Sequence, residues 1–181
     1  MLFCNRILHI KKHLLLLLLL LSIGTSLKAQ NNLPSASSLP EDVGDIAFDP
    51  KTDKADFYLC HQNFIIQYYN VATSYKGGGG TIKKLILNNY QYKPVYVATT
   101  GFVTIRFVIN CKGQTDRFRV VQMNNNYEQT IFNKDLIAQL LGICKSLDPW
   151  LPGKDGKGNI YDSYYYLNFK LVKGRITAIT P

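Results

Sequence analysis

The sequence of 181 residues predicts an α+β fold, a small antiparallel sheet of three to four strands with two helices packed on one face. Three observations predict it. Residues 102–109 alternate apolar and polar side chains, as a strand with one buried face does. Residues 134–147 place leucine and isoleucine at helical spacing. The tyrosine-rich segment 160–172 predicts a second long strand.

The first helix is expected over residues 82–90, directly after the glycine run 77–80. Thr81 is expected to cap it, because a threonine hydroxyl accepts hydrogen bonds from backbone N–H groups two or three residues on. Pro94 prevents its continuation. The glycine run lacks the GKS or GKT ending of a phosphate-binding loop, so we expect only a flexible break there. The apolar face of this helix consists of Ile82, Leu85, Ile86 and Tyr90.

A β-hairpin is expected next. The strand 102–109 and a return strand over residues 116–123 are joined by a tight turn at Lys112 and Gly113. One face of the first strand is apolar throughout, which predicts that this face is buried. That face consists of Val103, Ile105, Phe107 and Ile109.

The second helix and two further strands complete the predicted domain. Asn133 is a good N-cap, and Pro149 ends the helix after Leu147. Residues 160–172 form one long strand in this prediction, and residues 175–180 form a last strand that pairs with it.

The chain is expected to have four segments. Six acids face two lysines between Glu41 and Asp56, in a proline-containing stretch that predicts a flexible acidic lead-in. The aromatic residues that follow, up to Tyr69, are ambiguous between helix and strand. The expected segments are a signal peptide (1–29), the lead-in (30–56), an extension that packs on the domain (57–74) and the α+β domain (75–181).

The first 29 residues have the features of a secretory signal peptide. Basic residues precede a leucine-rich run, and residues 27–29 form a small-residue cleavage site. A retained anchor is the alternative, but the apolar run is shorter than the roughly 20 residues that a membrane span needs. Cys4 lies ahead of this run, which argues against a lipoprotein. We therefore expect a periplasmic or secreted protein after cleavage.

The chain carries a net charge of +9, of which four bases lie in the leader. The remainder is then at about +5, with its bases scattered along the chain. A basic domain can bind nucleic acid. Export and the scattered bases favour a solvated basic surface instead, so no nucleic-acid partner is expected.

Three cysteines follow the leader, and an oxidising compartment allows one disulfide that leaves the third thiol free. Cys144 lies among the leucines of the second helix and is expected to be a buried thiol. Cys111 lies in a turn, and Cys60–Cys111 is the favoured pairing. The absence of any disulfide is the alternative, because the sequence does not supply the Cα distances.

No catalytic residues, metal site or cofactor site are expected. His61 is the one histidine after the leader, and no residue near it in the sequence supplies the third group of a catalytic triad. The chain has no CxxC or HExxH motif and no EF-hand loop. The tyrosines at 164–166 suit either a carbohydrate platform or a half-buried strand, and their alternation between faces favours the strand. We therefore expect no enzyme and no small-molecule substrate.

Four motifs in register resemble the C-terminal domain of TonB, the periplasmic end of the energy transducer for outer-membrane transport in Gram-negative bacteria. The resemblance covers about residues 75–171. The first two motifs are Tyr75-Lys-Gly-Gly78, with the helix and Tyr92-Lys-Pro94 after it, and Gly101-Phe-Val-Thr-Ile-Arg-Phe-Val-Ile109 with its glycine turn. The last two are Trp150-Leu-Pro-Gly153, followed by Gly156 and Gly158, and Tyr166-Leu-Asn-Phe169.

The chain departs from the TonB pattern in three respects. The family's S-x-x-x-L-D-x-x-A signature is missing between Met123 and Leu136, and the closing strand lacks its proline. The chain also has a leader and a short acidic segment where a transducer has an anchor and a long proline-rich spacer. The resemblance therefore implies a stand-alone exported domain that does not transmit force from the inner membrane.

The resemblance implies that the chain binds a protein partner, such as the plug segment of an outer-membrane receptor, by adding a strand to a sheet edge. The edge residues expected to bind the partner are Tyr164, Tyr166, Asn168 and Lys170. Edge pairing would also permit a homodimer. The predicted strand 175–180 would cover this edge, so binding would require its displacement or use the other edge. The alternative function is that of an exported structural or interaction protein that uses the fold without energy transduction.

Overall fold

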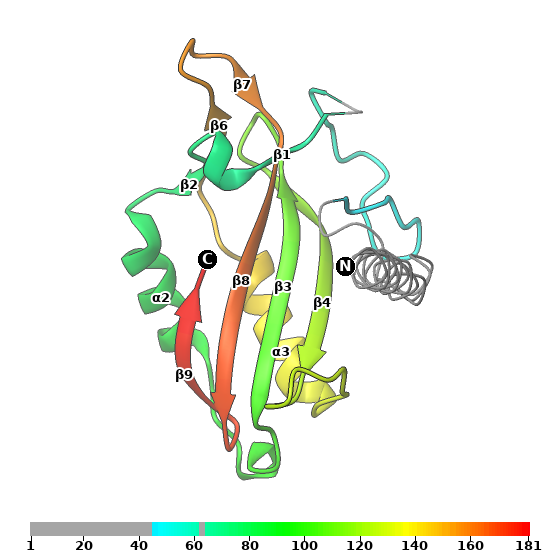
Figure 1. The fold of residues 1–181 in the computed structure, drawn as a ribbon, viewed down its shortest axis with the longest axis vertical. Helices are drawn as coiled ribbons and strands as arrows, with labels where there is room; N and C mark the ends of the chain where they lie inside the picture. The colour runs from blue at the N-terminus through cyan, green and yellow to red at the C-terminus, as the bar shows by residue number, and fades with distance from the viewer. Residues whose placement is uncertain (1–44, 62–63) are drawn as a thin grey trace, which may run out of the picture. The chain divides into compact units, whose positions relative to one another are not determined.

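The computed structural model describes residues 45–61 and 64–181 and has an α+β architecture, as predicted. Its main sheet has five strands in the order β1–β8–β3–β4, with β9 also paired to β8 (Figure 1). All pairs are antiparallel except β1 with β8. The strands are β1 (Ile66–Gln67), β3 (Gly101–Ile109), β4 (Thr115–Met123), β8 (Ser163–Val172) and β9 (Arg175–Thr180). The strand beyond the expected four is β1, which is too short to produce a periodic pattern.

Two α-helices pack on the same face of this sheet. The helices are α2 (Gly78–Asn89) and α3 (Lys134–Lys145), with the short 3-10 helices η2 (Tyr68–Asn70) and η3 (Pro94–Tyr96). Two small antiparallel pairs lie outside the main sheet. They join β2 (Ser74–Tyr75) to β5 (Trp150–Leu151) and β6 (Gly153–Lys154) to β7 (Ile160–Tyr161).

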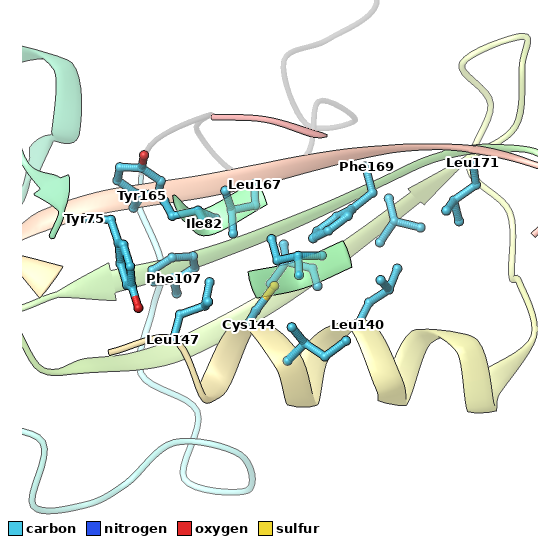
Figure 2. Packing of buried hydrophobic residues seen from close by; sticks show 14 of the residues in the cluster. Tyr75, Ile82, Phe107, Leu140, Cys144, Leu147, Tyr165, Leu167, Phe169 and Leu171 are labelled. Atoms are coloured by element: carbon cyan, nitrogen blue, oxygen red, sulfur yellow. The ribbon is translucent and has the colours of Figure 1, made fainter. Parts of the chain in front are cut away.

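The core lies between the sheet and these helices. β3 and β8 are paired in register, with Ile105 opposite Leu167 and Phe107 opposite Tyr165, so the apolar faces of both strands coincide. Figure 2 shows Phe107, Leu167 and Phe169 between the sheet and α3. Side chains that are 0 % exposed include Ile86, Val103, Ile105, Phe107, Leu136, Leu140, Cys144, Phe169 and Leu171. Cys144 is the expected buried free thiol, and burial raises its pKa to about 12.

The caps of the two helices differ from each other. Asn133 caps α3 as predicted, because its side chain accepts hydrogen bonds from the amides of Asp135 and Leu136. The predicted cap at Thr81 is wrong. α2 begins earlier, after Gly77 at φ 89°, and the Thr81 hydroxyl donates to the Gly77 carbonyl at 2.8 Å. Glycine adopts this left-handed conformation at little cost, so the helix starts within the glycine run.

The predicted long strand 160–172 is divided at Asp162. The residues before Asp162 pair with β6, and those after it pair with β3. The buried carboxylate of Asp162 accepts hydrogen bonds from the amides of His61 and Cys111, both at 2.8 Å. A carboxylate without charged partners is costly to bury, and these two amides offset that cost. The periodic pattern could not reveal the break, because both halves are rich in β-forming residues.

Residues 45–56 pack on the sheet, in contrast to the flexible lead-in that the sequence predicts. Ile46 is buried with Leu59, Val108 and Tyr164 on the face opposite the helices. The described residues of the segment 57–69 are mostly irregular and end in β1 and η2, which is neither the helix nor the strand considered from the sequence. The apolar contacts of Ile46 explain why the acidic composition around it did not prevent packing.

The expected signal peptide (1–29) and residues 30–44 of the expected lead-in lie outside the described residues. Among residues 45–61 and 64–181, no helix is long and apolar enough to cross a membrane.

Gly153 and Gly156 form a matched pair that tests the packing of the loop after Trp150. A Cβ on Gly153 would meet Thr73 Oγ1 at 2.6 Å and the Val71 side chain even closer, whereas a Cβ on Gly156 meets nothing within 4 Å. We expect Gly153→Ala to lower the free energy of unfolding by about 1–3 kcal/mol through overpacking. Gly156→Ala should change it by less than about 0.5 kcal/mol. Denaturant unfolding of both variants checks this, and equal effects would contradict the packing.

Candidate functional site

The outward-facing backbone groups of β8 lie on even-numbered residues. The carbonyl of Asp162, just before β8, accepts from the amide of Ile66 in β1 at 3.1 Å. The carbonyl of Lys170 accepts from Thr177 Oγ1 in β9 at 3.1 Å. Both carbonyls therefore point away from β3, and alternation along the strand gives the residues between them the same direction. These residues are Tyr164, Tyr166 and Asn168, so all four predicted edge residues present backbone groups at this edge.

Most of this edge is already paired. β1 pairs with Ser163 and Tyr164, and β9 pairs with residues 168–172 (Figure 1). The gap between the two is centred on Tyr166. One residue with outward groups is too short a template for a stable added strand, since strands usually have three residues or more. A partner strand at this edge therefore needs β9 to move.

The side chains of the four predicted residues lie in different surroundings. Tyr164 is buried, and its hydroxyl donates to Asp45 Oδ1 at 3.1 Å; burial, aided by this hydrogen bond, raises its pKa. Asn168 accepts a hydrogen bond from Thr104 Oγ1 at 2.7 Å. Lys170 is exposed. The half-buried Tyr166 lies 5.5 Å from the ring of Tyr68, whose pKa is raised to about 12 by burial and by its hydrogen bond to Tyr166.

The turn into β9 is held by residues that the sequence analysis did not single out. The amide of Gly174 donates to the carbonyl of Thr99 at 2.7 Å, and the hydroxyl of Tyr90 donates to the carbonyl of Gly174. Burial raises the pKa of Tyr90 to about 12. Gly174 has φ 74°, and a Cβ there would lie 2.6 Å from the Tyr96 carbonyl oxygen. The Lys-Gly pair at 173–174 signalled a turn, but its contacts come from distant residues.

The strand β9 itself is attached by its pairing with β8 and by two apolar side chains. Ile176 and Ile179 are partly buried against the core, whereas Arg175, Thr177 and Thr180 are exposed. The guanidinium of Arg175 lies 4.1 Å from the ring centroid of Tyr92, a cation–π contact on the protein surface. β9 is thus a terminal strand with two apolar anchors.

The opposite edge, on β4, is also partly covered. The carbonyl of Gln122 accepts from the amide of Thr130 at 3.1 Å, so Gln122 faces outward and alternation gives Val120 the same direction. The outward carbonyl of Phe118 accepts from the guanidinium of Arg119 at 3.0 Å. Val120 lies between these two hydrogen-bonded carbonyls, beside a shallow hollow of about 200 Å³.

Arg119 also fixes the segment 45–56 to the sheet. Its guanidinium donates to both carboxylate oxygens of Asp53, each at 2.7 Å, and to the carbonyl of Ala47 at 2.6 Å. The Asp53 side chain is only 1 % exposed. The hydrogen bonds from Arg119 lower the pKa of Asp53 from its ordinary 3.8 to about 2.

The structure joins Cys60 to Cys111 in a disulfide with a Cα–Cα distance of 6.1 Å. Asp162 lies beside them, and ligand atoms of the three residues lie within 4.8 Å of one another. Two thiolates and a carboxylate suit a zinc ion, but the disulfide occupies both sulfurs. This disulfide attaches the N-terminal segment to the β3–β4 turn, together with the hydrogen bonds that the Asp162 carboxylate accepts from the amides of His61 and Cys111. The sequence signal for Asp162 was a lone acid inside a tyrosine-rich strand.

His61 contacts its surroundings through its backbone amide and its ring. Asp162 accepts a hydrogen bond from the amide at 2.8 Å. The ring lies 5.6 Å from the ring of Tyr161, which is a packing contact.

The described residues therefore define an α+β protein whose candidate binding site is a partly covered sheet edge. No family model, curated protein or solved structure matches the chain. The resemblance to the TonB C-terminal domain stays a prediction.

The ion pair between Asp53 and Arg119 predicts an acid-sensitive contribution to stability. Because the folded-state pKa of Asp53 is lowered, the contribution is complete above about pH 4 and is lost as the pH falls to about 2. We expect Asp53→Asn to weaken the protein at neutral pH and to flatten the fall in stability across that window. Chemical unfolding from pH 2 to 7 checks this, with the exposed Asp56→Asn as the control. Equal pH slopes for wild type and Asp53→Asn would contradict the ion pair.

The direction of the backbone N–H groups of β4 predicts that proline is tolerated at one position and destabilising at the next. Val120→Pro removes an outward N–H, which an edge strand tolerates. Val121→Pro removes an N–H directed at Thr104 of β3, leaving a carbonyl without its donor. We expect the second variant to cost about 1–3 kcal/mol more in unfolding free energy than the first. Thermal unfolding of the two variants measures the difference, and the reverse order would refute the assigned register.

Proposed function

We propose that this chain is a non-enzymatic, exported protein-binding module that resembles the TonB C-terminal domain. It binds an extended segment of a partner, such as the plug segment of an outer-membrane receptor, by strand addition at β8. It acts in the periplasm, because the expected leader directs export and a disulfide persists in an oxidising compartment.

One observation supports this proposal above the others, namely that the chain's own terminal strand occupies the edge. β9 pairs antiparallel with β8 from Asn168 to Val172 and places Ile176 and Ile179 against the core. The edge therefore accepts an added strand with apolar side chains at the positions that face the helices. A partner that supplies such a strand makes the same main-chain hydrogen bonds and fills the same places.

The exchange is close to balanced in main-chain hydrogen bonds, since β9 and the partner strand offer the same groups. The tether gives β9 an effective concentration in the millimolar range, so it competes strongly with a free segment. The net binding free energy of the partner therefore depends on what its own side chains contribute at the positions of Ile176 and Ile179. β9 thus acts as a gate that lowers the apparent affinity in proportion to the time that it occupies the edge.

Truncation after Gly174 tests the gate, because it removes β9 and keeps the hydrogen bonds of the turn. The probe is a synthetic peptide of residues 175–181, the chain's own β9 sequence. We expect the truncated protein to bind this peptide saturably and the full chain to bind it at least about tenfold more weakly. Isothermal titration calorimetry measures both affinities.

Two further variants act as controls in the full-length chain. Ile176→Ala with Ile179→Ala loosens β9 without shortening the chain, and should raise the affinity for the peptide. Thr180→Ala alters an exposed position of the same strand and should leave it unchanged. Equal peptide affinities for the truncated and full-length proteins would refute the gate.

The partner class is tested by retention of outer-membrane receptors from a membrane extract on immobilised protein. Receptors bound through their plug segments, and bound more strongly by the truncated chain, support the proposal. Retention that is lost in Val120→Pro, and unaffected by truncation, would move the site to the β4 edge. Dimerisation of the truncated chain without receptor binding would favour the alternative of an exported structural protein.

A further inference from the structure

An open hollow of about 470 Å³ lies where the segment 45–59 meets the start of β4. This volume is within the range of small-molecule sites. Its walls combine aromatic and charged side chains, among them Phe48, Phe57, Lys54, Asp56 and Arg117. None of these residues contributes to the β8 edge, so the hollow is a separate feature of the molecule.

Arg117 is the unusual residue of this hollow. Its side chain is half-buried, yet no described carboxylate forms an ion pair with it. Its Nη1 makes one long hydrogen bond of 3.4 Å to the carbonyl of Ile46, and its buried Nε has no partner among the described residues. A buried donor without an acceptor is rare in native proteins and calls for an explanation.

The backbone of Arg117 is also unusual. Its φ of 56° lies in the left-handed region, which an arginine rarely adopts, and it follows directly on the buried Asp116. Asp116 accepts a hydrogen bond from the amide of Lys54 at 2.8 Å, which holds the segment 45–59 against this position. Strained backbone of this kind gathers at binding sites, where it directs a side chain toward a ligand.

We propose that this hollow binds a small monocarboxylate with an apolar body, whose carboxylate accepts hydrogen bonds from the guanidinium of Arg117. The planar guanidinium matches a carboxylate in a two-point contact. Lys54 adds a second positive charge at the wall. The apolar body lies against Phe48, whose ring centroid is 5.8 Å from the Arg117 guanidinium carbon, and against Phe57.

Asp56 limits the charge of the ligand. Its carboxylate lines the same hollow, so the two cations and one acid leave a net charge of one positive unit. A monoanion is balanced by this net charge, whereas a dianion such as hydrogen phosphate would leave one negative charge without compensation. The sequence predicts no small-molecule substrate, and this inference concerns a bound ligand without any reaction.

The test titrates the protein with 4-phenylbutyrate, 4-phenylbutyramide and inorganic phosphate, followed by ¹H–¹⁵N NMR. We expect 4-phenylbutyrate to bind with a Kd of about 1 mM or tighter, and to shift the amides of residues 54–59 and the Nε–H of Arg117. The neutral amide and phosphate should each bind at least about tenfold more weakly, because one lacks the charge and the other the apolar body.

Three charge-removing variants complete the test. Arg117→Gln should weaken 4-phenylbutyrate binding at least about tenfold, and Lys54→Gln should weaken it less. Lys83→Gln removes one charge from the exposed face of α2 and should change nothing. If Arg117→Gln does not fold, the comparison of carboxylate with amide on the wild type still decides. Equal binding of carboxylate and amide, tighter binding of phosphate, or unchanged binding in Arg117→Gln would each overturn the proposal.

Discussion

The pairing of β3 with β8 is the interaction on which the rest of the structure depends. Nine residue pairs, from Gly101 with Leu171 to Ile109 with Ser163, run without a register shift. This register places the apolar faces of both strands side by side, and α2 and α3 cover them. A shift of one residue would turn the apolar side chains of one strand away from the helices, and each buried apolar side chain contributes about 1.5–3 kcal/mol. The helices, the edges and the hollow all take their places from this pair.

The N-terminal segment is attached to this framework at three points of different chemistry. The Cys60–Cys111 disulfide and the buried Asp162 connect it to the β3–β4 turn, and Arg119 connects it to β4 through Asp53. Ile46 and Leu59 add an apolar contact with Val108 and Tyr164. The disulfide restricts the unfolded chain, whereas the ion pair and the apolar contacts act in the folded state. The segment therefore shapes the hollow beside Arg117 and also packs on Tyr164 at the start of the β8 edge.

The two proposed sites differ in whether their polar groups are already satisfied within the chain. At β8 the backbone groups are satisfied by β9, so a partner must replace interactions that already exist. At the hollow the Nη groups of Arg117 make only one long hydrogen bond among the described residues, so a ligand supplies interactions that the chain lacks. The first arrangement favours selectivity, since only a segment with suitable side chains can compete with the tethered strand. The second favours affinity for a small anion, since a partly desolvated charge gains much from a partner.

The sequence by itself determined the elements whose signal is local. The alternation of residues 102–109, the apolar stripe on α3 and its Asn133 cap depend on near neighbours and were predicted correctly, although α3 ends at Lys145 and not after Leu147. Tertiary structure decided the rest. Asp162 divides the long strand because the amides of His61 and Cys111 come to it from far along the chain, and residues 45–56 pack because Arg119 lies opposite Asp53. The pairing of β9 with β8 was predicted correctly, because the two strands adjoin through the turn at Lys173 and Gly174. The contact of Arg117 with Ile46, in contrast, joins distant segments. Such contacts leave no periodic pattern, and the physical reason is that they depend on where the sheet brings the chain together.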